Sequence, residues 1–380
     1  MKNIFKGKKI LVLRKEIYST YYDITIQGFL EFGNPSNVFT IKFNSDSDFN
    51  EINKNIVKII DKKDIDIFIS ASFYFILPTT FKCMSNILKI RIDGDDSSMF
   101  EIYSKWYAQF FDLNLTSSEE AREKFVKLGY QSIVFANMVN LSNININNKS
   151  EKDDIDISFI GTIKKKIDRE LYINEIKNKY DLRTYGIDSK SGYLNTNQKY
   201  RLYQKSKINL NFSGVSIIRN NKEKKITTMQ GRIFEIMAVG GFVLTEYTPT
   251  IKLFFEPGVH LEVFHNKNDL FKKIDYYLKN KSQREKIANS GKEIFFEKYQ
   301  YKNYFPNLIN EISNIEKINK LNLNYAWPNE LKLFLCQFIN YKYLYKYEYL
   351  KLVLKFLGWN NYLKNRFYRI KNIFLNNSYF

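Results

Sequence analysis

Short apolar segments alternate with segments of helical periodicity along most of this chain, and this alternation restricts the possible folds more than any other feature. Six apolar segments rich in β-branched and aromatic residues precede residue 137: Lys9–Leu13, Val38–Phe43, Ile65–Ala71, Leu88–Ile92, Phe111–Thr116 and Ser132–Ala136. Between them, segments such as Phe49–Lys63 and Ser118–Leu128 repeat apolar residues at spacings of three and four, as amphipathic helices do. Because alternating strands and helices form parallel sheets covered on both faces, residues 1–145 are predicted to be a Rossmann-like domain.

The alternation resumes after residues 141–154, a polar, asparagine-rich stretch that we interpret as a linker between domains. Five more strands are predicted: Ile155–Ile160, Leu182–Tyr185, Ile208–Phe212, Phe242–Thr245 and Leu261–Phe264. Helices are predicted over Lys199–Ser206, Asp269–Leu278 and Ser282–Tyr299. A second Rossmann-like domain over residues 155–300 follows. The fold class is therefore α/β, with two domains facing a cleft and ligands at the carboxyl ends of the strands.

Residues 301–380 are predicted to form a helical C-terminal extension, whose first part, 301–324, is expected to cross back to the first domain. The remainder, 325–380, is basic and aromatic: from Lys320 onward there are ten Lys or Arg residues and two acids. It lacks an apolar run of about twenty residues, so it is not expected to span a bilayer. Contact with a membrane surface and packing on the core or a second subunit both remain open, whereas nucleic-acid binding is the weakest of the three interpretations.

The charge and the cysteine content restrict the partners and the compartment. The formal net charge of +19 predicts attraction to phosphates, nucleic acid or anionic lipid. Cys83 and Cys336 lie in different predicted parts of the chain, so we expect two small buried residues in a reducing cytoplasm rather than a disulfide. The two histidines and two cysteines are not at metal-ligand spacing, and the N-terminal apolar run is too short for a signal peptide.

Residues 225–258 carry the strongest functional signal. Within them Arg232–Val239 is predicted to be a short apolar helix that ends at Gly240-Gly241 and leads into a strand. Glu235 lies among residues that favour burial, and a buried carboxylate requires a partner. Two partners are open: Arg232, one turn earlier, or the hydroxyls of a ligand such as a ribose.

Two basic segments near this helix could bind phosphate. Gly161 directly follows a predicted strand and is followed by Lys164, Lys165, Lys166 and Arg169; such a turn can hold a phosphate by backbone N–H groups, or be only a turn with a solvated basic face. The basic loop Ser213–Gln230 could close over a phosphate, or be solvated and mobile. Arg232, fixed on its helix, is the preferred phosphate contact because its guanidinium can bind in a bidentate manner.

An acidic turn at the end of the fourth predicted strand contains Asp93, Asp95 and Asp96. Clustered carboxylates raise one another's pKa and can supply a general base. Alternatively, Asp and Ser side chains at this point cap the following helix.

The sequence GRIFEIMAVGGFVLTEYTP, followed by FFEPG and YYLKN…REKIANSGKE, resembles the donor domain of spore-coat-type (CgeB-like) family 1 glycosyltransferases. These belong to the two-domain GT-B group, and the resemblance covers roughly residues 65–300. It implies that Glu235 binds the ribose of a nucleotide and that Gly161, Arg169, Arg232, Gly241 and Thr245 lie at the nucleotide-sugar donor. It also places Asp93 and Asp95 at the acceptor as candidate catalytic residues. The first glutamate of the related Glu-x7-Glu motif falls at Thr227, which is a departure from the pattern.

The resemblance implies a metal-independent, hexosyltransferase-like enzyme without a cofactor. It would move a sugar from a nucleotide-diphosphate donor to a hydroxyl of a lipid-linked surface glycan, as in polysaccharide biosynthesis. The expected location is the cytoplasm, peripheral on the inner face of the cell membrane. The alternatives are a non-catalytic nucleotide-sugar-binding protein and a membrane-surface adaptor that acts through its basic tail.

Overall fold

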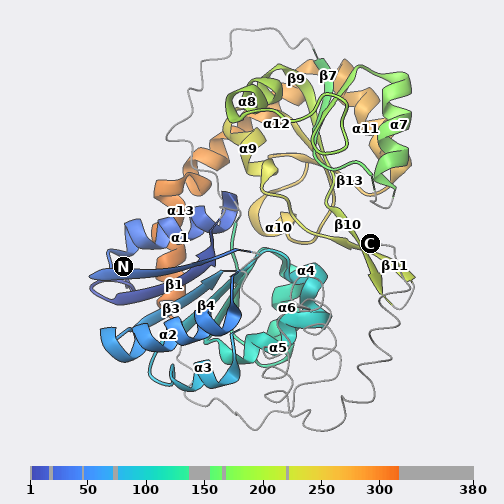
Figure 1. The fold of residues 1–380 in the computed structure, drawn as a ribbon. Coiled ribbons are helices and arrows are strands. Elements are labelled where there is room, and N and C mark those ends of the chain that lie inside the picture. Colours follow the sequence, from blue (N-terminus) through green and yellow to red (C-terminus); the bar gives the residue numbers. More distant parts are fainter. Residues whose placement is uncertain are drawn as a thin grey trace, which may run out of the picture.

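A computed structural model describes residues 2–16, 20–44, 47–71, 76–136, 155–164, 168–219 and 222–315. These residues form two α/β domains, each built on a parallel sheet (Figure 1). The predicted linker, residues 141–154, and the basic extension, residues 325–380, lie outside the described residues. The predicted α/β fold class is confirmed for both domains.

The first domain contains a six-stranded parallel sheet in the order β2-β1-β3-β4-β5-β6. Its strands are β1 (Lys9–Lys15), β2 (Asn37–Phe43), β3 (Ile67–Ala71), β4 (Leu88–Asp93), β5 (Leu113–Thr116) and β6 (Ser132–Val134), so all six predicted strands are confirmed. The helices are α1 (Thr20–Gly33), α2 (Phe49–Lys63), α3 (Pro78–Lys82), α4 (Asp96–Met99), α5 (Lys105–Tyr107) and α6 (Glu119–Lys127). A π-helical turn over Phe100–Ser104 and a 3-10 turn over Ala108–Phe110 flank α5.

The second domain contains a five-stranded parallel sheet in the order β13-β12-β9-β7-β8. Its strands are β7 (Ile155–Ile160), β8 (Leu182–Tyr185), β9 (Ser206–Asn211), β12 (Val243–Glu246) and β13 (Glu262–Phe264), again at the predicted places. The helices are α7 (Arg169–Lys179), α8 (Thr196–Lys205), α9 (Arg232–Ala238), α10 (Ile251–Phe254), α11 (Lys267–Lys279) and α12 (Lys281–Ile294), with a π-helical turn over Phe295–Tyr299. The chain runs outward from β7 to β8 and then returns to the other side of β7, so the strand order reverses there, where open sheets of this kind bind ligands.

The basic segment predicted as a loop is instead an antiparallel hairpin of β10 (Gly214–Arg219) and β11 (Lys222–Thr227). It projects from the second domain toward α4 of the first (Figure 1), and α4 contacts β11. The sequence expectation failed here because the charged residues between Arg219 and Lys225 interrupt the apolar pattern from which a strand is recognised.

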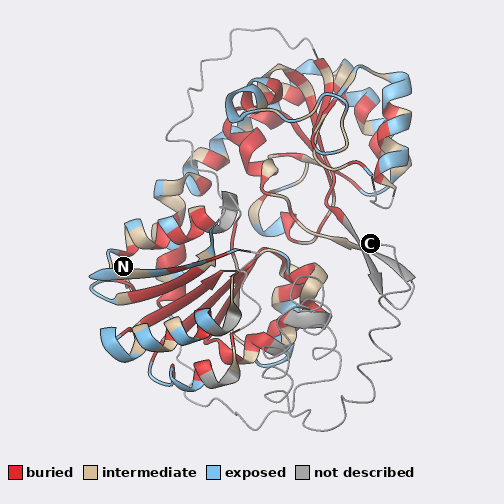
Figure 2. Cartoon of the chain, in the orientation of Figure 1, coloured by how far each residue is buried: buried red, intermediate tan, exposed pale blue. Residues whose placement is uncertain are grey.

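Helix α13 (Tyr301–Ile312) returns to the first domain, as predicted, and packs against α1 (Figure 1). The Phe305 ring lies over Gly28, where an added Cβ would be 2.3 Å from it, and meets the Phe29 ring edge-on at 6.0 Å between centroids. The Tyr304 hydroxyl accepts a hydrogen bond from the Ala136 N–H at 2.7 Å. A single apolar cluster includes buried residues of both domains. Figure 2 shows the buried segments of each domain in red.

Two expectations from composition concern burial of the cysteines and membrane-spanning segments. Cys83 is exposed, which corrects the expectation that it is buried, and Cys336 lies outside the described residues. In the part of the chain that the structure describes, no helix is long and apolar enough to cross a membrane.

Candidate functional site

Gly161 and Arg232 meet at the carboxyl end of β7, where the structure brings together two of the residues predicted to bind a donor. Gly161 has a φ of 153°, and a Cβ added to it would lie 2.7 Å from Arg232 Nη1. Arg232, the first residue of α9, donates a hydrogen bond to the Ile160 carbonyl, and its guanidinium lies 5.8 Å from the centroid of the Phe159 ring. The absence of a side chain at residue 161 therefore lets the guanidinium lie against the backbone of the turn.

Arg169, at the start of α7, is a second buried guanidinium beside the same turn. It donates hydrogen bonds to the carbonyls of Thr162 at 2.8 Å and Gly214 at 2.7 Å. Burial and the positive charge of Arg232 lower the pKa of Arg169 to about 10, against an opposing effect of Glu246. The two positive charges repel each other, so an anion beside both guanidiniums would be stabilised by both.

The backbone N–H groups of the turn are partly occupied by a protein carboxylate. Asp188 Oδ2 accepts hydrogen bonds from the amides of Ile163 at 3.1 Å and Lys164 at 3.0 Å. These amides therefore do not offer the open phosphate cradle that the sequence suggested, and the arginines supply the positive charge instead. Lys165 and Lys166 lie outside the described residues.

Glu235 is buried on α9, one turn after Arg232, and its carboxylate is paired. Glu235 Oε1 accepts a hydrogen bond from Lys199 Nζ at 2.7 Å, and the Tyr203 hydroxyl lies 3.5 Å from Oε2. The interpretation of Arg232 as its ion-pair partner is thus wrong, because the Arg232 side chain points to the Ile160 carbonyl. Among the described residues, Oε2 has only the long contact to Tyr203, so it is the atom better placed to accept a further hydrogen bond.

Sequence reasoning missed Lys199 and Tyr203, although a signal was present. They lie four residues apart on α8 and so share one face of that helix. A capping box of Asn195 and Gln198 fixes the start of α8, which places Lys199 in the first turn. The requirement that a buried carboxylate have a cationic partner could have led to Lys199, but nothing in the sequence placed α8 beside α9.

Gly241 and Thr245 lie in closely packed surroundings. A Cβ on Gly241 would be 2.7 Å from both Asn209 Nδ2 and Ile236 Cγ2, so the space beside it is filled by protein. Thr245 is fully buried, and its hydroxyl accepts a hydrogen bond from Asn211 Nδ2 at 2.8 Å. Both residues support the position of α9 and β12, whereas Gly161, Arg169 and Arg232 lie at the carboxyl end of β7 and Glu235 lies one helical turn further along α9.

Glu246, at the end of β12, fixes the base of the hairpin. Its Oε2 accepts hydrogen bonds from the amides of Ser213 at 3.0 Å and Gly214 at 2.8 Å, and its Oε1 pairs with Lys225 Nζ at 2.5 Å. Partial burial lowers the pKa of Lys225, but the hydrogen bond and charge of Glu246, together with Asp168 at 3.5 Å, raise it above the ordinary value. The hairpin is thus attached to the same turn as Arg169, through Gly214.

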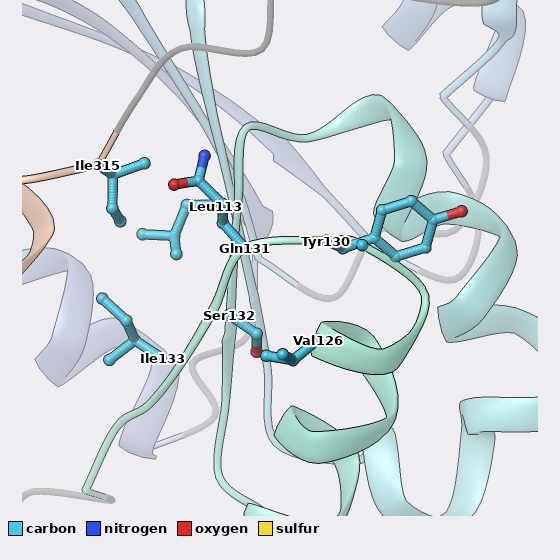
Figure 3. A pocket seen from close by; sticks show the side chains of 8 residues that line it. Leu113, Val126, Tyr130, Gln131, Ser132, Ile133 and Ile315 are labelled. Carbon is cyan, nitrogen blue, oxygen red and sulfur yellow. The ribbon is translucent and has the colours of Figure 1, made fainter.

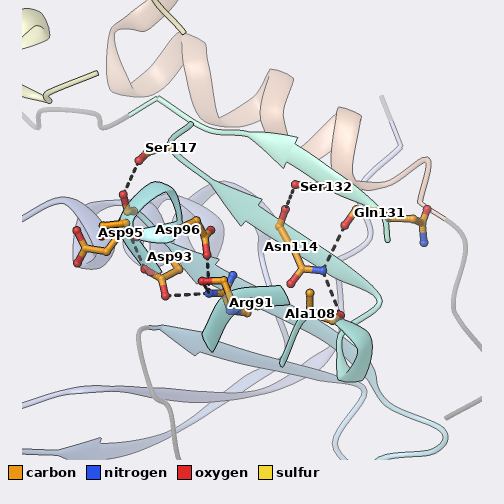
Figure 4. Close-up of polar contacts among 12 residues, drawn as sticks. Arg91, Asp93, Asp95, Asp96, Ala108, Asn114, Ser117, Gln131 and Ser132 are labelled. Carbon is orange, nitrogen blue, oxygen red and sulfur yellow. Dashed lines mark hydrogen bonds and ion pairs between the residues drawn. The ribbon is translucent and has the colours of Figure 1, made fainter. Parts of the chain in front are cut away.

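In the acidic turn, Asp93 and Asp96 are buried and share one arginine (Figure 4). Arg91 Nη2 donates to Asp93 Oδ2 at 2.9 Å and to Asp96 Oδ1 at 2.6 Å. Burial, and secondarily the charge of Asp96, raise the pKa of Asp93 to about 7 although Arg91 opposes the shift. Because one guanidinium faces two carboxylates, the cluster holds excess negative charge that a proton on Asp93 relieves.

Asp95 is the exposed member of the acidic turn. Its backbone N–H donates to Asp93 Oδ1 at 2.9 Å, so the buried Asp93 fixes the backbone from which Asp95 projects. Asp95 precedes α4, but its side chain makes no capping hydrogen bond, so capping does not account for it. The turn is directed toward the second domain: α4 contacts β11, and the Glu119 N–H, just after β5, donates to Thr250 Oγ1 at 3.0 Å. Among the described residues, no three or more His, Cys, Asp or Glu side chains are grouped so as to hold a metal ion.

Comparison with known proteins supports the same interpretation. Residues 162–310 match the model of a family described as glycosyl transferase-like. No curated protein sequence matches this one.

Three solved structures are similar over most of the chain. A glycosyltransferase from Rickettsia africae superposes with a TM-score of 0.58 at 15% identity, covering 81% of this chain and 98% of its own. Sucrose-phosphate synthase from Thermosynechococcus elongatus gives 0.56 at 9% identity, covering 80% and 98%. HepE from Anabaena, in complex with UDP and glucose, gives 0.55 at 11% identity, covering 81% and 100%.

At these identities the superpositions establish the fold, and the family match covers the residues that include Arg169, Arg232 and Glu235 and begins directly after Gly161. The resemblance to GT-B glycosyltransferases is thereby confirmed. Residues 162–310 are similar to the glycosyl transferase-like family, and the two domains of the chain together have the GT-B fold.

Proposed function

We propose that this protein is a glycosyltransferase that moves a sugar from a nucleoside-diphosphate donor to a hydroxyl of a lipid-linked glycan. The observation that carries the proposal is the order of groups along the start of α9. Arg232, with Arg169 behind it, offers positive charge at the Gly161 turn, and Glu235 offers a carboxylate oxygen one helical turn further on. A diphosphate bound to the arginines would leave its ribose within reach of Glu235.

In this proposal the arginines also assist the chemistry. Breaking the bond between the anomeric carbon and the diphosphate oxygen leaves negative charge on the departing nucleotide. Hydrogen bonds to backbone carbonyls hold Arg232 and Arg169 in place, so the charge that develops in the transition state would meet a preorganised positive site. Activity is then expected without a divalent ion and should survive a chelator.

The acidic turn is proposed to face the acceptor. Asp95, which is exposed, is the better placed of the two predicted residues to contact the acceptor hydroxyl or remove its proton. Asp93 is almost completely buried, so we assign it a positioning role through its hydrogen bond to the Asp95 amide. Substitution of Asp95 should lower turnover and leave nucleotide affinity unchanged.

A lipid-linked acceptor fits the basic and aromatic extension, residues 325–380, which would hold the enzyme at the inner face of the membrane. Each basic residue near an anionic surface contributes about 1 kcal/mol, so contact by a few of the nine lysines and arginines in this segment would be enough to determine localisation. Binding to vesicles of phosphatidylglycerol compared with phosphatidylcholine tests this part separately, because donor binding does not depend on it.

The donor site is tested by a thermal-shift panel of uridine, guanosine, adenosine and cytidine diphosphates with wild type, Glu235→Ala and the matched surface variant Glu170→Ala. At a hundredfold excess over its Kd, a true ligand stabilises the fold by about 2.7 kcal/mol. One nucleotide should raise the Tm of wild type and Glu170→Ala, and less that of Glu235→Ala. Equal shifts in all three proteins would contradict the role of Glu235, and no shift with any nucleotide would contradict the donor site.

A second candidate is a nucleotide-sugar-binding protein without transferase activity. Thr227, in place of the first motif glutamate, favours it, because that residue lies in β11 and supplies no carboxylate at this position. The two candidates differ in turnover: a binding protein would retain the Tm shift but never release nucleoside diphosphate from a bound nucleotide sugar.

A further inference from the structure

Strand β6 is an edge of the first sheet, and its outer side faces no other strand among the described residues. The Gln131 carbonyl accepts from the Asn114 amide, and the Phe135 amide donates to the Thr116 carbonyl, so these residues direct their backbone toward β5. Because successive residues in a strand alternate, the backbone groups of Ser132 and Val134 point to the outer edge. An edge of this kind can accept one more strand.

A largely apolar groove lies beside this edge (Figure 3). It has a volume of about 430 Å³ and is formed mainly by the end of α6, the following turn and β6: Leu113, Val126, Gly129, Tyr130, Gln131, Ser132, Ile133 and Ile315. Val126 is 50% exposed and the neighbouring Leu128 is 49% exposed. Exposed apolar side chains beside an open strand edge are typical of a surface that binds another polypeptide segment.

The chain itself enters this groove. Ile315, which lines it, follows α13 and is the last described residue before 65 further residues. Six residues later the sequence reads Leu-Asn-Leu-Asn-Tyr-Ala-Trp, residues 321–327, in which large apolar residues occupy every second position. Pro328 follows directly. Alternation of period two ended by proline is typical of a strand with one apolar face, and does not have the spacing of a helix.

We propose that residues 321–327 pair with the outer edge of β6 as an additional strand, with their apolar side chains covering the groove. The five connecting residues, 316–320, can span up to roughly 17 Å when extended, which exceeds the roughly 4.8 Å between neighbouring strands. Main-chain hydrogen bonds would give this pairing its affinity, and Leu321, Leu323, Tyr325 and Trp327 would give it specificity. The helix predicted over 301–324 would then end near Ile312, as α13 does.

Residues 321–327 fit this surface better than the interdomain linker does. The groove lies at the beginning of β6, between Gly129 and Ile133, where Ile315 is already present. The linker, in contrast, leaves from beyond Ala136, past the other end of β6, and must reach β7 in the second domain. Pairing of 321–327 would also fix the point from which the rest of the basic extension leaves the first domain.

Photocrosslinking in the full-length protein tests the proposal. The photoreactive residue p-benzoylphenylalanine replaces Val126 or, as a control, Leu171, which is 65% exposed on α7 of the other domain. Trypsin cuts after Lys320 and Lys332, so the expected crosslinked peptide is 321–332. It should be captured from position 126 and not from position 171, and in a mixture of isotope-labelled and unlabelled protein both peptides should carry the same label. Capture of residues 137–154, capture between differently labelled chains, or no captured peptide would each overturn the proposal.

Amide hydrogen exchange gives an independent readout. Leu323→Pro removes a donor and disrupts the added strand, whereas Lys332→Pro makes the same change beyond Pro328. Leu323→Pro should accelerate exchange of the Ser132 or Val134 amide by roughly tenfold or more, and Lys332→Pro should not. The amide of Ile69 in β3 should exchange equally slowly in all three proteins. Unchanged exchange at both edge amides in Leu323→Pro would overturn the pairing.

Discussion

Asp96→Asn is predicted to stabilise the protein at pH 8 and not at pH 5. In the wild type, Arg91 Nη2 hydrogen-bonds both Asp93 and Asp96, so one guanidinium neutralises two buried carboxylates incompletely. Asparagine keeps the shape of residue 96 and keeps an oxygen to accept from Arg91. Its amide nitrogen would take the place of Asp96 Oδ2, which has no hydrogen-bond partner among the described residues. The substitution therefore removes one charge and preserves the hydrogen bond.

The magnitude follows from the pKa of Asp93, raised from 3.8 to about 7 by burial first and by Asp96 second. In the folded state Asp93 keeps its proton up to about pH 7, whereas in the unfolded chain it loses the proton near pH 4. Stability therefore falls as pH rises through this window, by about 1.4 kcal/mol per unit and by about 4 kcal/mol in all. Because Asp96 is the second cause, Asp96→Asn should recover part of this loss at pH 8, on the order of 1 kcal/mol. Below pH 5 Asp93 is already protonated and little remains to be recovered.

Urea unfolding followed by circular dichroism at pH 5, 6, 7 and 8 measures this effect as a shift of the midpoint. The exposed Asp61, on α2, provides the matched control as Asp61→Asn. The midpoint difference between Asp96→Asn and wild type should grow with pH, while that of the control stays near zero. A difference that is equal at pH 5 and pH 8 would show that Asp93 carries no excess charge in the fold, and would refute the reasoning.

Three further substitutions probe the donor site. Arg232→Leu removes a charged hydrogen-bond donor worth about 1.5–3 kcal/mol, so calorimetry should find the Kd for nucleoside diphosphate raised about 10- to 150-fold. In the control Arg201→Leu, on the exposed side of α8, the Kd should be unchanged. Gly161→Ala places a Cβ 2.7 Å from Arg232 Nη1, so both Tm and nucleotide affinity should fall, and an unchanged affinity would argue against contact between this turn and the ligand. Lys199→Ala leaves the Glu235 carboxylate buried without its cation, so the free energy of unfolding in urea should fall by about 1–3 kcal/mol. This is less than for a fully enclosed pair, because the Lys199 side chain is 23% exposed. A loss below about 0.5 kcal/mol, the size expected for an ordinary surface substitution, would contradict the pairing.

Much of the fold could be predicted because it depends on periodicity that is local in the sequence. Strands such as Ile155–Ile160 and Leu182–Tyr185 are found with the predicted bounds, and α2 coincides with the predicted helix Phe49–Lys63. In each case the apolar residues that define the pattern are those that the sheet or the helix face buries. The β10–β11 hairpin escaped prediction because its stability comes from contacts at its base, including those of Glu246 with the amides of Ser213 and Gly214.

The candidate site was only partly predictable, because its partners come from elements distant in sequence. Lys199 pairs with Glu235 across 36 residues, and Asp188 reaches the amides of Ile163 and Lys164 from the loop after β8. For Asp93, the acidic cluster was visible in the sequence, but its burial on Arg91 was not. Nothing in the sequence distinguishes Arg91 from the other residues of its predicted strand. Positions fixed by local pattern were therefore correct, whereas the assignment of partners required the tertiary structure.

The most direct test of transferase function is release of nucleoside diphosphate from nucleotide sugars. After the binding panel identifies the base, the wild type and Arg232→Leu are incubated with glucose and N-acetylglucosamine derivatives of that nucleotide, in EDTA, with and without a membrane-lipid extract as acceptor source. The account predicts that the wild type releases nucleoside diphosphate in EDTA, faster with the extract, and that Arg232→Leu releases at least about tenfold less. Nucleotide sugars that bind tightly and remain uncleaved under both conditions would contradict it, and would identify the protein as a nucleotide-sugar-binding protein.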